Sequence, residues 1–80
     1  MHYIATFHTH LGAMTFKNRL QAMGDTEAVM MPVPRALSSS CGTCVFYEGE
    51  SPLLETLDRD VEGVYRRTGD GYETILQNEV

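Results

Sequence analysis

Apolar residues recur at helical spacing in the first third of the chain. They are Ala13, Phe16, Leu20 and Met23, and the polar residues Lys17, Asn18 and Gln21 take the other side. Thr9 stands where a helix N-cap is expected, and Gly24 supplies a C-terminal stop. Just before this segment, residues 3–7 are short, aromatic and β-branched, as in a strand. The pattern predicts a strand that leads directly into a helix over residues 10–23.

The next stretch alternates between short apolar runs and a polar loop. Residues 28–33 form a continuous apolar run of strand length, and Pro32 and Pro34 limit the pairing of its amides. Residues 35–43 are rich in serine and glycine and have no apolar period, so we expect an exposed loop there. Residues 44–47 then predict a short strand.

The C-terminal third predicts a second helix and a last strand. Ser51 and Pro52 are an N-cap and first-turn pair, and Arg66 and Arg67 would close the helix favourably. The apolar stripe that would face the core is Leu53, Leu54, Leu57, Val61, Val64 and Tyr65. Glu55, Asp58 and Glu62 would lie on the outer face of this helix. Residues 72–76 alternate as a strand after Asp70-Gly71.

These elements predict one domain over residues 1–80, with a core at about residues 3–76, in the order β-α-β-β-α-β. That order is typical of an α+β ferredoxin-like sandwich, in which two helices cover one face of a four-stranded antiparallel sheet. The first two strands would run parallel, so the loop after the second would lie near the start of the first helix. We therefore expect Cys41 close to His8, Thr9 and His10.

Charge and hydropathy narrow the classes of function. The net charge is −5, and residues 48–80 hold nine acidic residues against three arginines, which argues against nucleic acid as a partner. We interpret this acidic half as a solvated helix face rather than a docking surface. The longest apolar run without a proline, residues 28–31, has four residues and no secretory signal is visible, so we expect a cytoplasmic protein without membrane association. Eighty residues leave no room for a deep substrate cavity, which argues against catalysis on a large substrate within one copy.

The candidate chemistry lies in the segment Ser38-Ser39-Ser40-Cys41-Gly42-Thr43-Cys44. In a reducing cytoplasm such a pair of thiols serves metal binding, redox exchange or covalent carriage better than a structural disulfide. A nearby helix N-terminus lowers the pKa of a thiol. Serine hydroxyls and the Gly42 amide could receive a negative sulfur or a persulfide.

Three other interpretations of the pair stay open. The two thiols could be inert in a turn. A thiol-disulfide redox module is weakened because Cys44 runs into a strand, whereas redox motifs normally open a helix. A zinc-type site could combine Cys41 and Cys44 with His8 and His10, a ligand set that suits tetrahedral zinc.

The segment from Pro34-Arg35 to Ser40-Cys41-Gly42 resembles the family described as "Putative Se/S carrier protein-like", over about residues 3–65. The resemblance implies a carrier that moves sulfur or selenium between donor and acceptor proteins and needs no cofactor. Cys41 would be the cysteine that carries the atom. The other residues of its site would be Arg35, Ser39, Ser40, Gly42 and Thr9.

The carrier hypothesis also gives Cys44 a role, and the sequence differs from the family pattern at three residues. Cys44 would attack the Cys41 adduct, release the chalcogen and leave a disulfide. His8 and His10 do not belong to the family pattern and Cys44 is variable in it, which keeps the metal and dithiol alternatives open. A homodimer formed through the sheet is compatible with the sequence.

Overall fold

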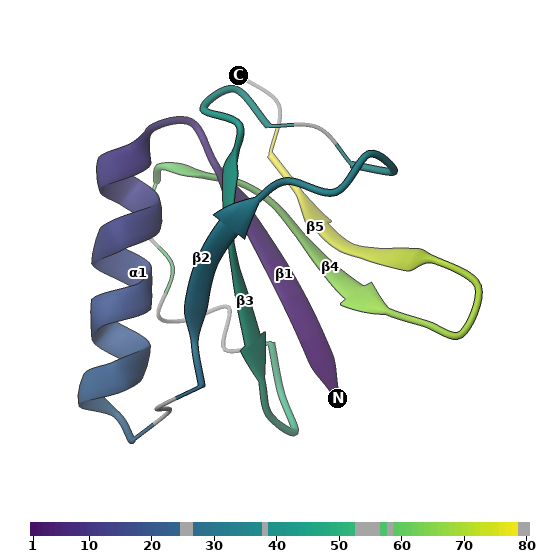
Figure 1. The fold of residues 1–80 in the computed structure, drawn as a ribbon, viewed down its shortest axis with the longest axis horizontal. Coiled ribbons are helices and arrows are strands. Elements are labelled where there is room, and N and C mark those ends of the chain that lie inside the picture. Colours follow the sequence, from purple (N-terminus) through teal and green to yellow (C-terminus); the bar gives the residue numbers. More distant parts are fainter. Residues whose placement is uncertain (25–26, 38, 53–56, 58, 79–80) are drawn as a thin grey trace.

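A computed structural model describes residues 1–24, 27–37, 39–52, 57 and 59–78. In these residues one helix lies against a five-stranded sheet (Figure 1). The elements are β1 (His2–Phe7), α1 (His10–Ala22), β2 (Val29–Pro32), β3 (Thr43–Glu48), β4 (Val61–Arg67) and β5 (Tyr72–Gln77). The sheet order is β2-β3-β1-β4-β5, and every neighbouring pair is antiparallel. No helix in these residues is long and apolar enough to cross a membrane.

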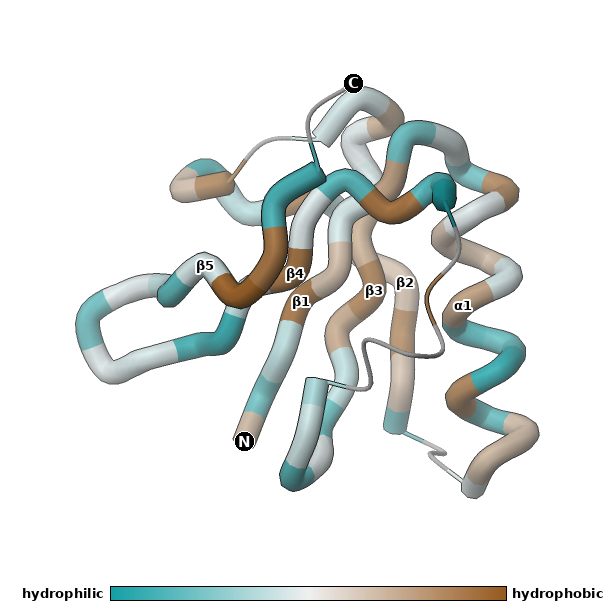
Figure 2. The backbone as a smooth tube through the Cα atoms, turned by 180° about the vertical axis from the view of Figure 1, so that it is seen from behind, coloured by the Kyte–Doolittle hydropathy of each residue, from teal (hydrophilic) through white to brown (hydrophobic). Residues whose placement is uncertain are grey.

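The main core lies between α1 and one face of the sheet. Ala13, Phe16 and Leu20 are the buried residues of α1, as the helical spacing predicted, whereas Met23 follows the end of the helix and is exposed. The Phe16 ring meets Phe7 at a centroid distance of 5.6 Å and Tyr47 edge-on at 5.2 Å. Burying each such aromatic ring stabilises the fold by roughly 1.5–3 kcal/mol. Figure 2 shows the same division along the chain, with apolar stretches in the strands and a hydrophilic β4–β5 turn.

The second face of the sheet is partly covered by the loop that joins β2 and β3. Side chains alternate along a strand, so Ile4, Thr6 and Cys44 point away from α1, and all three are buried. The loop leaves the end of β2 and runs towards β5 before it returns to β3 (Figure 1). Its residues Arg35 and Leu37 line a groove together with side chains of β4 and β5.

The predicted second helix is wrong over residues 61–65, which belong to β4. The apolar residues at 61, 64 and 65 fit a helical stripe, but β-branched valines also suit a strand. Pairing decides the outcome, because the central strand β1 has hydrogen-bonded neighbours on both sides, β3 and β4. Residues 53–56 and 58 of the predicted helix lie outside the described residues. The α+β class is confirmed, and the described residues form one helix and five strands, whereas the sequence predicted two helices and four strands.

The predicted orientation of the first two strands is confirmed in direction. β1 and β2 both run antiparallel to β3, which lies between them, so they point the same way without pairing. This is a split βαβ arrangement around α1. The C-terminal ends of β1 and β2 therefore lie at the same end of the sheet. The start of α1 and the loop with Cys41 lie at that end.

Candidate functional site: a cysteine turn at the end of the sheet

Cys41 lies in a tight turn formed by residues 39–42. The Gly42 amide donates to the Ser39 carbonyl at 3.3 Å, which closes the turn. Gly42 has a φ of 72°, in the left-handed region that glycine adopts without strain. The Val33 amide donates to the Gly42 carbonyl at 3.1 Å and ties the two ends of the loop together. The turn therefore has a defined backbone and holds Cys41 at its third position.

The Cys41 thiol is half-buried and has two polar neighbours. Its Sγ lies 3.3 Å from the Thr43 carbonyl, to which the thiol donates, and 3.7 Å from Ser39 Oγ. The Ser39 hydroxyl also donates to the Phe7 carbonyl at 2.9 Å, at the end of β1. This contact confirms that the loop lies beside the segment that leads into α1. Ser39 is thus a predicted site residue whose hydroxyl lies beside the sulfur.

Glu62 holds the turn from the neighbouring strand. Its Oε1 accepts from the Ser40 amide at 2.8 Å, and its Oε2 accepts from the Ser40 hydroxyl at 2.6 Å. His8 Nδ1 lies 3.5 Å from the same Oε2. Burial by itself would raise the pKa of Glu62, but the hydrogen bonds from Ser40, the His8 charge and the Ser39 hydroxyl together lower it.

Sequence reasoning missed Glu62 because it assigned this residue to the solvated face of a helix. Residue 62 lies in β4, where it reaches across to the end of β1 and the cysteine turn. A signal was present in the alternation of residues 61–65, where a β-branched residue, an acid, a glycine and another β-branched residue also fit a strand with an irregularity.

Cys44 has a different environment from Cys41. It belongs to β3 and is fully buried, on the face of the sheet opposite α1. Burial, with a smaller contribution from Cys41, raises the pKa of the Cys44 thiol to about 11. Its thiol donates to the Pro32 carbonyl at 3.9 Å. At neutral pH this residue is therefore a protonated thiol without access to solvent.

Comparison with known proteins now adds to the geometry. The family model described as "Putative Se/S carrier protein-like" matches residues 2–65. The chain belongs to this family. It is also 28% identical over 65 residues to a "Putative sulfur carrier protein" of Aquifex aeolicus (strain VF5), a match that covers 74% of this chain and 33% of that protein. The chain thus spans about a third of the length of this curated relative. No solved structure matches the chain.

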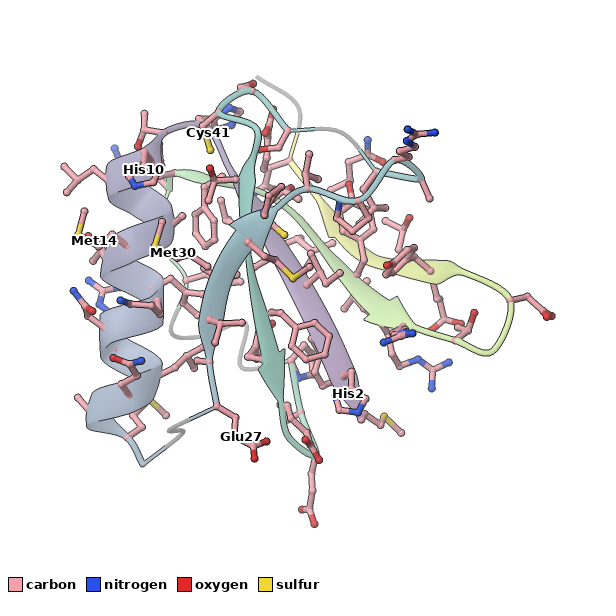
Figure 3. All side chains as sticks on the ribbon, viewed as in Figure 1. His2, His10, Met14, Glu27, Met30 and Cys41 are labelled. Carbon is pink, nitrogen blue, oxygen red and sulfur yellow. The ribbon has the colours of Figure 1, made fainter. Side chains whose placement is uncertain are left out.

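In this member of the Se/S carrier family, the N-terminus of α1 is capped by the side chain of Thr9. Thr9 Oγ1 accepts from the Gly12 amide at 3.1 Å, which confirms the predicted N-cap. The Thr9 amide and hydroxyl both donate to Asp60 Oδ2, at 3.0 and 2.6 Å. These hydrogen bonds join Thr9 to Asp60 and Gly12, and none of them involves Cys41. His10 and Cys41 lie at the same end of the molecule (Figure 3).

The remaining predicted site residues are not all gathered around Cys41. Arg35 lines a groove of about 400 Å³, and Cys41 is absent from its lining; the other residues of this groove are Ala36, Leu37, Tyr65, Tyr72, Thr74 and Gln77. Among the described residues, no three His, Cys, Asp or Glu side chains form a group that could hold a metal ion. His8 faces Glu62 and Cys44 is buried under the other face, so the four residues of the zinc alternative are not brought together.

Proposed function

We propose that this chain is a sulfur or selenium carrier domain, in which Cys41 holds the transferred atom as a persulfide or selenopersulfide. Membership of the Se/S carrier family and the name of the Aquifex relative support the class of function. The observation that carries the residue assignment is the contrast between the two cysteines. Cys41 is half-exposed in an ordered turn at the end of the sheet, whereas Cys44 is buried with a raised pKa.

The transfer is a thiol exchange at the terminal sulfur of a persulfide. The Cys41 thiolate attacks the outer sulfur of a donor persulfide, a new S–S bond forms at Cys41 and the S–S bond of the donor breaks. The donor leaves as a thiolate, which takes up the proton that Cys41 released. Transfer to an acceptor protein is the same step in reverse, with the acceptor thiolate as the nucleophile. No external oxidant or reductant enters either step.

The contacts in the turn change which groups are expected to donate hydrogen bonds to a persulfide on Cys41. The amides of Ser40 and Gly42 already donate to Glu62 and Ser39, so they hold the turn together rather than receive the adduct. The hydroxyl beside the sulfur is that of Ser39, 3.7 Å from Cys41 Sγ. Rotation of this hydroxyl away from the Phe7 carbonyl would let it donate to a charged persulfide. We assign Ser39 as the donor for the adduct.

The geometry favours a packing role for Cys44 rather than a resolving one. An attacking thiol must be ionised and must reach the adduct. The Cys44 thiol has a pKa of about 11 and is fully buried in β3. In this mechanism the chalcogen leaves by attack of an acceptor from solvent, and no internal disulfide forms.

Intact-mass measurement after incubation with glutathione persulfide, under non-reducing conditions, tests the proposal. The wild type and Cys44→Ala are expected to gain the mass of one sulfur atom, and Cys41→Ser is expected to gain none. Serine at a half-exposed turn position costs little stability, so a loss of loading would report chemistry rather than unfolding. Equal loading of Cys41→Ser and wild type would contradict the carrier role of Cys41. A disulfide between the two cysteines with no retained atom would point to a dithiol redox module instead.

A further inference from the structure

Glu62 sits at an irregularity of β4 that changes the direction of its side chain. In the pairing of β4 with β1, Thr6 faces Gly63 and Phe7 faces Val61, so Glu62 is left without a partner residue on β1. This two-against-one count defines a β-bulge, a feature that re-aims side chains and often occurs next to functional sites. The Glu62 carbonyl accepts from the Asn78 amide at 2.9 Å, which fixes the backbone of the bulge from its other side.

The re-aimed carboxylate binds the residue that precedes Cys41. Both its oxygens are engaged by Ser40, through the amide at 2.8 Å and the hydroxyl at 2.6 Å. Hydrogen bonds to an ionised acceptor are shorter and stronger than those between neutral groups. These hydrogen bonds lie at the surface of the protein, while the Glu62 and His8 side chains themselves are only 23% and 25% exposed. Glu62 therefore links β4 to the turn over 22 residues of sequence.

A negative charge is the wrong group for acidifying a neighbouring thiol, since it disfavours the thiolate. The carboxylate also makes its hydrogen bonds with Ser40 and none with the Cys41 sulfur. An electrostatic role in activating Cys41 therefore does not explain why the bulge directs Glu62 here. A geometric role does, because two hydrogen bonds to one residue fix its backbone position and the orientation of its side chain.

We propose that Glu62 is a positioning residue for the sulfur transfer: by clamping Ser40 it holds the turn in the conformation that presents Cys41 to the donor. The proposal rests on the carrier function of Cys41. Ser39 secures the turn to β1 through Phe7, and Glu62 secures the adjacent residue through β4. Together they fix the segment in front of the sulfur at two points. Displacing a reactive group from its productive geometry commonly costs one to two orders of magnitude in rate.

Two measurements on the same variants test this role. The first is the rate of loading of Cys41 from glutathione persulfide, measured by intact mass. The second is hydrogen exchange of the Ser40 amide, which reports the clamp whether or not the protein carries sulfur. Glu62→Ala is expected to slow loading about tenfold and to speed Ser40 exchange about tenfold, with exchange of the buried Val45 amide unchanged. Glu62→Gln retains an oxygen acceptor for the Ser40 amide and should recover most of both effects.

A double-mutant cycle and a matched control complete the design. Ser40→Ala removes the hydroxyl bond to Glu62 but keeps the amide bond, so it should slow loading less than Glu62→Ala does. The double variant should be no slower than Glu62→Ala, because without Glu62 the Ser40 hydroxyl has no contact with it left to lose. Glu73→Ala, which removes a β5 glutamate that pairs with Arg66 at 3.1 Å, should leave loading unchanged.

The outcomes separate this proposal from the proposed function. A wild type that does not load at all contradicts the carrier function, while the exchange of the Ser40 amide still reports the clamp. Unchanged Ser40 exchange in Glu62→Ala overturns the clamp. Faster exchange with normal loading in that variant overturns the positioning role.

Discussion

At the scale of single residues, the two cysteines differ in the access and the ionisation of their thiols. Cys41 is half-buried in a turn, and Cys44 is fully buried with a pKa of about 11. Only a thiolate reacts with alkylating reagents. We therefore expect iodoacetamide at limiting dose and neutral pH to modify Cys41 first, with Cys44 modified only after unfolding in denaturant. Peptide mapping of the alkylated protein checks this order, and preferential modification of Cys44 in the native protein would reverse the two roles.

The pKa of Glu62 gives the stability of the protein a pH dependence of known sign. Contacts with Ser40 and His8 lower this pKa in the folded state, so the unfolded state binds the proton more tightly. The stabilisation is present above the unfolded pKa and is lost as the pH falls through the folded pKa. Because the group is partly exposed, the effect should stay below about 1 kcal/mol.

Urea unfolding measured from neutral pH down to about pH 3 is the check. The wild type should lose more stability than Glu62→Gln over the acidic part of this range, since glutamine does not titrate. Parallel losses in the two proteins would show that the clamp contributes no net stability.

At the scale of elements, α1 is closed at its start by a residue far away in the sequence. Asp60 accepts from the amide and the hydroxyl of Thr9, and Gly12 leaves the space in which its carboxylate sits. A glycine within a helix is normally destabilising by about 1 kcal/mol relative to alanine. Here a Cβ at residue 12 would collide with the Asp60 carboxylate and displace it from the cap. The sequence predicts the Thr9 cap but gives no hint of its partner.

Gly12→Ala is therefore expected to destabilise the protein, against the usual sign for a helix. The loss should be on the order of 1 kcal/mol, the scale of a broken hydrogen bond less the gain in helix propensity. Denaturant unfolding of Gly12→Ala, Asp60→Gly and the double variant measures it. Glycine at residue 60 also removes the Cβ that a Cβ at residue 12 would meet at 2.9 Å. In the Asp60→Gly background the alanine at residue 12 should become stabilising, and a stabilising effect in the wild-type background as well would contradict the packing described.

The elements that the sequence predicted well are those in which local pattern and tertiary pairing agree. The strand before α1, the helix itself and the last strand all appear within a residue or two of the expected bounds. Residues 61–65 failed because their apolar positions fit two periods, and the choice depended on β1, a strand more than fifty residues away. The failure to predict Glu62 as a site residue is a consequence of the same error. Its role arises from a bulge, which no spacing rule reveals.

At the scale of the whole molecule, the split arrangement of β1, β3 and β2 brings the site together. β1 and β2 finish at the same end of the sheet, and β4 starts at that end because it is antiparallel to β1. From there Glu62 reaches the cysteine turn and His8 contacts Glu62, while Ser39 of the turn bonds to Phe7 at the end of β1. This part of the site was predictable from the direction of the strands. The family match ends at residue 65, within β4, so the pairing of β5 extends the sheet beyond the matched region.

The same arrangement bears on the zinc alternative for the whole protein. The core is built from aromatic and aliphatic side chains around Phe16 and Tyr47, so folding has a source of stability other than a metal. His8 contacts Glu62, and the Cys44 thiol lies under the opposite face of the sheet.

We expect the purified protein to contain well below one equivalent of zinc and to keep its thermal unfolding midpoint when chelator is added. Elemental analysis and thermal unfolding followed by circular dichroism, with and without chelator, measure both quantities. One zinc per chain together with a lower midpoint on chelation would show that the thiols and histidines meet in a conformation other than this one, and the metal hypothesis would then replace the carrier.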